Sequence, residues 1–347
     1  MFYYSININD EQEKEKIVRF LHKLNLRYED DIEFTLTVVD NNEIIGTGSI
    51  SGKILKCIGV KPERQGEGIS AKIITYLMQE QFKRGRNHIF LFTSPDKADR
   101  FINLGFQEVA SAEPNFTLLE MGIGGIKKYL ENLKEHKLRT NDKKTISSIV
   151  VNANPFTLGH QYLVKKASLE SDAVYVFVVK EDKSLFPFKV RFNLVKKGCQ
   201  EFENVEVING GDYIISNSTF PTYFTRDSEE KIVFMQATLD VNIFAKYIVP
   251  TLNIKRRYIG EEPYCGTTNL YNKAMKQILP SVGVKVVEVP RLKIKGVAVS
   301  ASTVRNLIKK SDFIKLQELI PESTYRFLVS KEAYPIIEKI KSSRSRH

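Results

Sequence analysis

Residues 150–167, VVNANPFTLGHQYLVKKA, contain the change of pattern that decides the fold of the second half of the chain. An apolar run ends at Asn152, a short segment with Pro155 follows, and a helical pattern begins near Gly159. A strand that leads directly into a helix is the repeating unit of a parallel sheet. His160, one of five histidines in the chain, falls on the first turn of the expected helix.

The same alternation of strand and helix patterns continues through the rest of the chain. The expected strands lie at residues 146–151, 173–179, 205–208, 257–260 and 285–289, and the expected helices begin near residues 159, 190, 270 and 300. Alternation of this kind predicts a Rossmann-like parallel sheet with helices on both faces and ligands at the carboxyl ends of the strands.

The first part of the chain has a different pattern, typical of a mixed sheet. Strand-like segments separated by short polar turns predict an antiparallel meander at residues 32–39, 43–51 and 53–60. The glycine-rich turn Gln65-Gly66-Glu67-Gly68 follows, then an apolar helical pattern and a strand at residues 88–92. The fold class that we expect is therefore α/β throughout, with two differently built sheets.

The length of the chain favours two domains. At 347 residues it exceeds the roughly 250–300 residues at which a single core stops growing. A stretch rich in Lys, Glu and Asn after residue 123 marks the junction. We expect a first domain at residues 1–127, a helical linker at 128–144 and a second domain at 145–347.

Composition excludes several classes of protein. With 42% hydrophobic and 27% charged residues, the chain is typical of a globular protein and not of a disordered one. Cys57, Cys199 and Cys265 lack the spacing of a zinc site or a disulfide framework, and we expect no protein-built metal site. No apolar run approaches the ~20 residues of a membrane span and the N-terminus is too polar for a signal peptide, so we expect a cytoplasmic protein. The net charge of +11 favours anionic partners without choosing among nucleotides, RNA and an acidic carrier protein.

The turn before the helix at residue 159 has the features of an anion site. Free backbone N–H groups at a helix N-terminus attract phosphate. Gly159 allows close approach of the backbone, Thr157 offers a hydroxyl, and His160 can place a ring nitrogen on a phosphate oxygen. The alternative is that His160 only caps the helix or packs in the core, and this segment by itself does not decide between the two.

A second helix start, within VSASTVR at residues 299–305, points to the same ligand. Ser300, Ser302 and Thr303 supply hydroxyls near the start of the helix, and Arg305 follows within two turns. An N-cap, worth about 1 kcal/mol, needs a single hydroxyl. Three hydroxyls and a guanidinium are better suited to the phosphates of a nucleoside triphosphate.

Taken together, TLGH and SASTVR resemble the paired motifs of the nucleotidyltransferase superfamily, in which a nucleoside triphosphate is attacked at its α-phosphorus and pyrophosphate leaves. Five segments resemble the citrate lyase ligase family more closely: NANPFTLGHQYLV, VVKEDKSLFPFKVR, STFPTYF, IGEEPYCGTTNLYNKAMKQILP and VSASTVR. The first domain is similar to the GNAT acetyltransferase-like domain of that family. The resemblance extends from about Lys56 to Lys309.

The resemblance implies roles for individual residues. Thr157, Gly159 and His160 match the first motif, which implies binding of ATP phosphates and stabilisation of the transition state. Ser300, Ser302 and Arg305 match the second motif, which implies contacts to the β and γ phosphates. Catalysis is thus expected of His160, Arg305 and Ser300, and further cofactor-binding candidates in or near the motifs are Asn154, Phe156 and Thr303. Arg191 and Lys180 are weaker candidates for phosphate or carboxylate contacts, and Glu261 or Glu262 for magnesium or the ribose, with ordinary solvated charges as the alternative.

In the first domain, Gln65, Gly66 and Gly68 resemble the GNAT pyrophosphate loop, whose backbone amides hold the diphosphate of coenzyme A. Ser70 stands where that loop usually has Gly or Ala, and no base for acetyl transfer is evident. Our hypothesis is that this domain binds a CoA-like prosthetic arm.

The function implied by the resemblance is that of an AMP-forming ligase. ATP with Mg²⁺ would activate acetate as acetyl-adenylate, and the acetyl group would pass to the thiol of the phosphoribosyl-dephospho-CoA group on the acyl carrier subunit of citrate lyase. Neither a membrane nor a nucleic acid is expected as partner. Three alternatives remain open: an adenylyltransferase for a phosphate-bearing cofactor, an acetate ligase acting on tRNA, and a non-catalytic nucleotide-binding protein.

Overall fold

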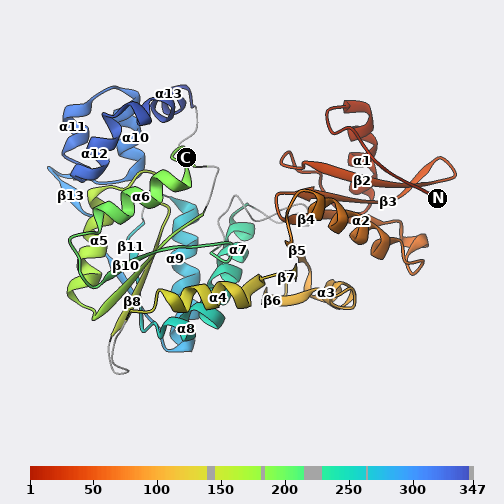
Figure 1. Ribbon diagram of the computed structural model, residues 1–347, viewed down its shortest axis with the longest axis horizontal. Coiled ribbons are helices and arrows are strands. Elements are labelled where there is room, and N and C mark those ends of the chain that lie inside the picture. Colours follow the sequence, from red (N-terminus) through yellow and green to blue (C-terminus); the bar gives the residue numbers. More distant parts are fainter. Residues whose placement is uncertain (139–144, 181–183, 215–228, 263–264, 344–347) are drawn as a thin grey trace. The chain divides into compact units, whose positions relative to one another are not determined.

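The computed structural model describes residues 1–138, 145–180, 184–214, 229–262 and 265–343 (Figure 1). The segment STFPTYF at residues 218–224 and the last part of the expected linker, residues 139–144, lie outside the described residues. By their packing, the described residues form two compact units. The first comprises residues 1–129 and the described part of 220–242, and the second comprises the described parts of 130–219 and 243–347.

The first unit is a seven-stranded mixed sheet with helices, drawn in red to yellow in Figure 1. Its elements are β1 (Phe2–Ser5), α1 (Glu11–Lys23), β2 (Phe34–Asp40), β3 (Glu43–Ser51), β4 (Ile54–Val60), η1 (Pro62–Arg64), α2 (Ile69–Lys83), β5 (His88–Thr93), α3 (Pro95–Ile102), β6 (Gln107–Ala112) and β7 (Phe116–Gly122).

The strand order in this sheet is β1-β2-β3-β4-β5-β7-β6. Neighbouring strands are antiparallel except β4 and β5, which are parallel and pair where Ile54 faces Phe90 and Leu55 faces Leu91. Helix α2 packs its apolar stripe, with Ile73 and Leu77, on the core of β2, β3 and β4. The loop that follows β4 and leads into α2 carries the glycine-rich turn, so the sheet holds that turn at a helix N-terminus.

The second unit is built on a five-stranded sheet. Its elements are β8 (Ile146–Val151), α5 (Leu158–Leu169), β9 (Ala173–Val178), α6 (Phe188–Gly198), β10 (Val205–Asn209), η2 (Phe244–Ile248), α8 (Val249–Leu252), β11 (Arg256–Gly260), α9 (Gly266–Ile278), η3 (Leu279–Val282), β12 (Lys285–Val289), β13 (Lys293–Ile294), β14 (Val297–Ala298), α10 (Ala301–Lys309), α11 (Phe313–Gln317), α12 (Glu322–Leu328), η4 (Lys331–Ala333) and α13 (Tyr334–Ser342). Two helices, α4 (Gly125–Glu135) and α7 (Glu229–Ile243), continue along the chain from one unit into the other.

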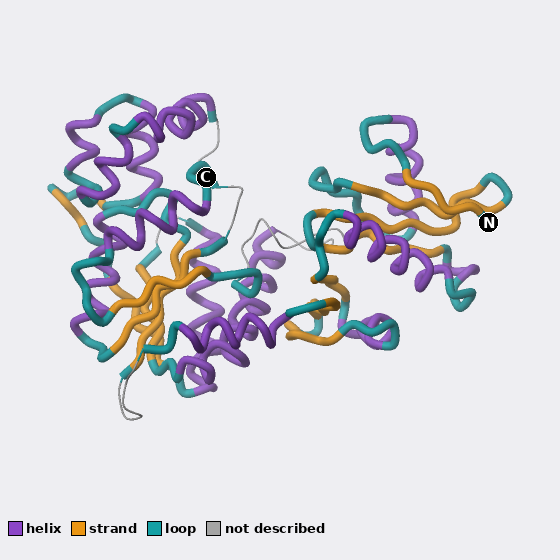
Figure 2. The backbone as a smooth tube through the Cα atoms, in the orientation of Figure 1, coloured by secondary structure: helices purple, strands orange, loops and turns teal. Residues whose placement is uncertain are grey.

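All five strands are parallel, in the order β10-β9-β8-β11-β12, and Figure 2 shows them side by side in orange. Alternate residues of β9 face opposite sides. Val176 and Val178 pack with α5 and α6, whereas Phe177 meets Phe244 of η2 edge-on. The chain leaves β10 at one edge and returns beside β8, so the strand order reverses between β8 and β11. In an open parallel sheet, that reversal places the ligand crevice at the carboxyl ends of these two strands.

The C-terminal helices form a further core together with the segment that leads into α6. Val304 and Ile308 of α10 pack with Leu185 and Phe186 near the start of α6, and with Leu316 and Ile340 of the later helices. This packing fixes the N-terminus of α10, the second of the two motif helices, relative to the rest of the unit.

One long helix was not expected from the sequence. Residues 230–252, from α7 through α8, are long and apolar enough to cross a membrane by length and composition alone. In the protein, 67% of their most apolar stretch is buried, as in the core helix of a globular protein. The length and composition of this helix are therefore weak evidence for a membrane span.

The expected fold class is confirmed, with a mixed sheet in the first part of the chain and a parallel sheet in the second. In the second unit each expected strand is present within one residue of its predicted bounds. The sequence analysis missed α1, whose N-cap Asp10 accepts hydrogen bonds from the backbone N–H groups of Gln12 and Glu13. Those cap residues and the acidic first turn were readable signals of a helix start.

Candidate functional site

The first motif lies where β8 leads into α5. Thr157 caps the helix, and its Oγ1 accepts from the backbone N–H of His160 at 3.4 Å. In return, the Thr157 backbone N–H donates to Nδ1 of His160 at 3.0 Å. The capping role foreseen as an alternative for His160 is therefore present. It also has a chemical consequence: a neutral ring whose Nδ1 accepts this bond carries its proton on Nε2.

The surroundings of His160 keep its ring neutral. Burial, followed by the positive charge of Arg291, lowers the pKa of His160 to about 4. The ring stacks on Phe156, with centroids 5.6 Å apart and planes 19° from parallel. At neutral pH this side chain is therefore uncharged, and its N–H group is at Nε2.

The second motif begins at Ser300, which caps α10. Ser300 Oγ accepts from the backbone N–H of Thr303 at 3.0 Å. The hydroxyls of Ser302 and Thr303 lie 2.9 and 2.8 Å from the same oxygen. Three hydroxyls are thus clustered at one helix N-terminus, where the backbone dipoles favour an anion.

The two motifs lie side by side because Gly159 has no side chain. A β-carbon at Gly159 would come within 2.9 Å of the carbonyl oxygen of Val299, the residue before Ser300. The neighbouring Leu158 donates its backbone N–H to the carbonyl of Leu319 at 3.0 Å. The N-termini of α5 and α10 are therefore neighbours in the structure.

Arg305 ties the second motif to the loop of the first. Its Nη1 donates to the carbonyl of Asn154 at 2.6 Å, across 151 positions of sequence. The side chain is 7% exposed, and this burial lowers its pKa. Asn154 in turn accepts from the backbone N–H of Phe186 through Oδ1 at 3.0 Å. Phe156 is fully buried, and its carbonyl accepts from the hydroxyl of Thr324, so these two loop residues shape the site from inside.

Arg191 and Lys180 lie in different environments. Arg191 is completely buried, and its guanidinium donates to the carbonyls of Phe186, Asn152 and Val179 at 3.0, 2.8 and 2.8 Å. Those carbonyls belong to the loops that follow β8 and β9. Lys180 is half-exposed and forms an ion pair with Asp212 at 3.2 Å. The predicted contacts of both residues with a ligand stay predictions.

A third group of residues stands at the carboxyl ends of β11 and β12. Arg291 forms an ion pair with Glu262, and its Nε donates to the carbonyl of Glu261 at 2.9 Å. Glu262 also accepts from the backbone N–H of Cys265 at 3.0 Å. The sequence analysis did not single out Arg291, although its position just after an expected strand of the parallel sheet was a signal of proximity to the crevice.

In the first unit, the glycine-rich turn has the conformation that requires glycine. Gly66 and Gly68 have φ values of +91° and +74°, and no atom lies within 4 Å of where their β-carbons would be. Backbone conformation, not lack of space, therefore explains both glycines. Gly68 is the residue before α2, and Gln65 donates from Nε2 to the carbonyl of Val60 at 3.4 Å.

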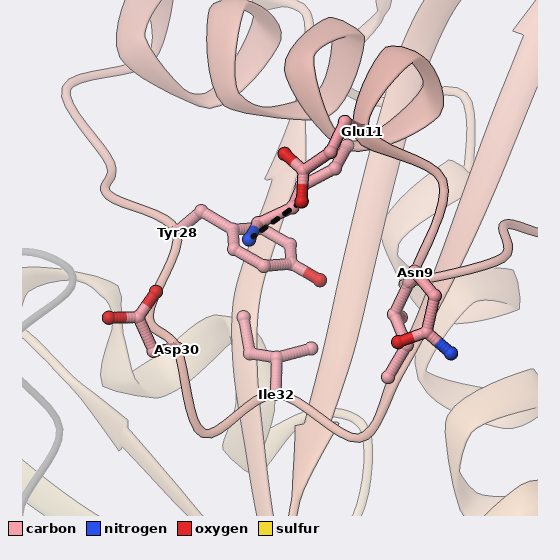
Figure 3. Close-up of a pocket in the computed structure, with 7 residues that line it drawn as sticks. Asn9, Glu11, Tyr28, Asp30 and Ile32 are labelled. Carbon is pink, nitrogen blue, oxygen red and sulfur yellow. Dashed lines mark ion pairs between the residues drawn. The ribbon is translucent and has the colours of Figure 1, made fainter.

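The same unit has a polar pocket elsewhere, with a cavity of about 280 Å³ (Figure 3). Glu11 and Lys14 of α1 form an ion pair at 4.0 Å on one side, and the Lys14 ammonium lies over the ring of Tyr28. The lining is completed by Ile8, Asn9, Asp30 and Ile32. Because none of the residues of the glycine-rich turn lines this pocket, the two are separate features.

The described residues contain no group of three or more His, Cys, Asp and Glu side chains placed to hold a metal ion. Glu262, a candidate for magnesium, is paired with Arg291 instead.

Comparison with known proteins gives matches to both units. A family model described as the citrate lyase ligase C-terminal domain matches residues 146–328, and the acetyltransferase (GNAT) family model matches residues 3–106. A [citrate [pro-3S]-lyase] ligase from Klebsiella pneumoniae is 36% identical over 93% of this chain and 94% of its own. The proteins of the same name from Escherichia coli and Haemophilus influenzae are 34% and 33% identical over 90% and 92% of this chain, and 89% and 97% of their own lengths.

Proposed function

The chain belongs to the citrate lyase ligase family, and from that premise we propose that it activates acetate with ATP and transfers the acetyl group to a carrier-bound thiol. It is an enzyme of the ligase class, as its curated relatives are. The observation that carries the proposal is the meeting of two helix N-termini, α5 and α10, through the contact of Gly159 with the backbone of Val299. That arrangement suits a polyphosphate.

The proposed reaction has two steps. A carboxylate oxygen of acetate attacks the α-phosphorus of ATP, the bond from that phosphorus to the bridging oxygen breaks, and pyrophosphate leaves. The sulfur of the acceptor thiol then attacks the carbonyl carbon of the acetyl group in acetyl-adenylate. AMP leaves with the former carboxylate oxygen, and the thiol proton is released. Neither step requires a nucleophile from the protein.

The site residues have separate roles in this proposal. The neutral ring of His160 donates from Nε2 to an oxygen of the phosphate chain, where negative charge grows as pyrophosphate departs. Ser300, Ser302 and Thr303 offer hydroxyls to the β and γ phosphates together with the N-terminus of α10. Arg305 holds the loop at Asn154 and brings a positive charge toward the same phosphates. Mg²⁺ would enter with ATP and neutralise the leaving pyrophosphate.

The acceptor in this proposal is the acyl carrier subunit of citrate lyase, because the curated relatives are named as ligases of that enzyme. We further propose that its prosthetic group is a phosphoribosyl-dephospho-CoA, that the turn at Gln65, Gly66 and Gly68 binds this CoA-like arm, and that the protein works in the cytoplasm. Gly66 and Gly68 have the positive φ values that a tight amide-lined turn needs. We keep the proposed domains at residues 1–127 and 145–347, with a linker at 128–144.

The proposal is tested by pyrophosphate release from ATP, measured with and without acetate. We expect release that depends on acetate in the parent and falls at least 100-fold in His160→Ala. His136→Ala is the matched control, because His136 is a half-exposed histidine paired with Glu206. Release driven by a phosphomonoester would identify an adenylyltransferase, acetylation of tRNA would identify the RNA-directed ligase, and no turnover at all would contradict an enzymatic role.

A further inference from the structure

Three neighbouring strands of the parallel sheet are each followed by charged or polar residues at their carboxyl ends. The β8 strand leads to the loop before His160, β11 leads to Glu261 and Glu262, and β12 leads to Arg291. Because the strands are parallel and adjacent in the order β8-β11-β12, their carboxyl ends meet at the same crevice. Of these residues, Glu261, Glu262 and Arg291 have no role in the reaction described above.

The position of Arg291 is fixed from two sides. Its Nε donates to the carbonyl of Glu261, and Nη2 pairs with the carboxylate of Glu262. Glu262 is itself held by the backbone N–H of Cys265, at the start of α9. The Arg291 side chain is nevertheless 18% exposed, so the guanidinium is not sealed inside the protein. A charge that is both oriented and accessible is suited to ligand binding.

The backbone next to Arg291 leads directly to both phosphate motifs. The carbonyl of Leu292 accepts from the backbone N–H of Val299 at 2.9 Å. The carbonyl of Val299 lies against Gly159, and Ser300 follows it. Arg291 is also close enough to His160 for its charge to disfavour protonation of that ring. The backbone contacts thus bring the residue after Arg291 to the segment before Ser300, and the effect of the Arg291 charge on His160 shows that the guanidinium lies near that ring.

We propose that Arg291 contacts the phosphate chain of ATP beside His160, and that Glu262 is the positioning residue that orients its guanidinium. The inference rests on the proposed function for the identity of the ligand as ATP. A guanidinium carries five N–H donors, so Arg291 can keep its bonds to Glu261 and Glu262 while another N–H meets a phosphate oxygen. Because His160 is neutral, the positive charge of the site must come from other groups, and Arg291 adds to that of Arg305 next to the growing negative charge.

A carboxylate has the same oxyanion chemistry as a phosphate, so acetate is the other substrate that Arg291 could contact. The Michaelis constant that changes in an Arg291 variant distinguishes contact with ATP from contact with acetate. Loss of a phosphate contact raises the Kd and KM for ATP and leaves the KM for acetate nearly constant. Loss of a carboxylate contact raises the KM for acetate and leaves the Kd and KM for ATP nearly constant.

The test uses the full chain, four single variants and the double variant of Arg291→Gln with Glu262→Gln. Arg291→Gln removes the charge, Arg291→Lys keeps it without the paired geometry, and Glu262→Gln keeps the shape of the positioning residue while removing its charge. Lys276→Gln is the control, because Lys276 is an exposed cation on the neighbouring α9, paired with Glu288 at 2.9 Å. ATP binding is measured by calorimetry without acetate, acetate-dependent pyrophosphate exchange gives KM and kcat, and circular dichroism checks folding.

We expect Arg291→Gln to raise the Kd for ATP at least tenfold, Arg291→Lys to give a partial effect, and Lys276→Gln to stay within twofold of the parent. Glu262→Gln should raise KM for ATP more than it lowers kcat, and should have no further effect in the Arg291→Gln background. An unchanged Kd in a folded Arg291→Gln variant, or a rise confined to the KM for acetate, would overturn the proposal. If the parent shows no acetate-dependent exchange while Arg291→Gln still weakens ATP binding, the proposed function fails and the assignment of Arg291 is supported.

Discussion

Gly159 and Val299 are in backbone contact although they are 140 positions apart in the sequence, and this contact joins the two phosphate motifs. A β-carbon on Gly159 would lie 2.9 Å from the Val299 carbonyl oxygen. The contact atom belongs to the backbone and not to a flexible side chain, so it cannot move away without shifting Ser300, the cap of α10. The distance between the two helix N-termini is therefore set by the absence of one methyl group.

This contact predicts the effect of Gly159→Ala. The added methyl should push the start of α10 away from α5, lower the stability by about 1–3 kcal/mol and weaken ATP binding by at least tenfold. Gly266→Ala is the control, since Gly266 also lies on the first turn of a helix but has no atom within 4 Å of its β-carbon position. Calorimetric ATP binding and urea unfolding of both variants check the prediction. Equal ATP affinity in Gly159→Ala and Gly266→Ala would show that ATP binding does not depend on the spacing of the two motifs.

The low pKa of His160 predicts a pH dependence of stability. Burial and the charge of Arg291 hold the pKa near 4, whereas a histidine in an unfolded chain titrates near 6.5. As the pH falls below about 6.5, His160 becomes protonated in the unfolded chain, whereas in the native protein it stays neutral until about pH 4. This group therefore lowers the stability across that window as the pH falls, by about 2 kcal/mol between pH 7.5 and 5.

Urea unfolding of the parent and His160→Gln at the two pH values isolates this contribution. We expect the parent to lose more stability than the variant, because glutamine does not titrate. Activity should show no loss from His160 protonation above about pH 5. A ring that titrates near 6.5 by NMR would contradict both the stability and the activity prediction.

The sequence predicted local features well because their causes are local. The run of β-branched and aromatic residues in β9 predicted a strand, the helical pattern from Gly159 predicted one helix start, and the hydroxyl side chains from Ser300 onward predicted another. The bond of Arg305 to the carbonyl of Asn154 was not predictable, because it depends on how α10 lies beside the loop that follows β8. The pairing of Arg291 with Glu262 likewise requires β11 and β12 to be known neighbours.

The environment of Arg191 predicts a large effect on stability. Its buried guanidinium donates to three backbone carbonyls, and Arg191→Met would leave all three without this donor. We expect a loss of about 3–5 kcal/mol, typical for breaking a buried charged network. Arg326→Met should cost below about 1 kcal/mol, because Arg326 is exposed and pairs with Glu322 on its own helix. If Arg191→Met unfolds like the parent in guanidinium chloride but no longer binds ATP, Arg191 contacts the ligand and is not chiefly structural.

The glycine-rich turn of the first unit predicts a separation of the two half-reactions. Gly66→Val and Gly68→Val place a β-branched residue at positive φ, which should distort the turn proposed to bind the CoA-like arm. Acetate-dependent pyrophosphate exchange should stay within about twofold of the parent, because the residues proposed for it lie in the other unit. Acetylation of the carrier thiol should fall at least tenfold.

Gly52→Val is the matched control for these variants. Gly52 has a φ of +53° in the same unit, also without an atom within 4 Å of its β-carbon position, but it lies in the turn between β3 and β4. The strain is therefore similar while the location differs. Carrier acetylation is followed by mass spectrometry of the acyl carrier subunit. Loss of exchange and acetylation together in Gly66→Val and Gly68→Val, or an equal loss of acetylation in Gly52→Val, would show that the turn does not serve the acceptor specifically.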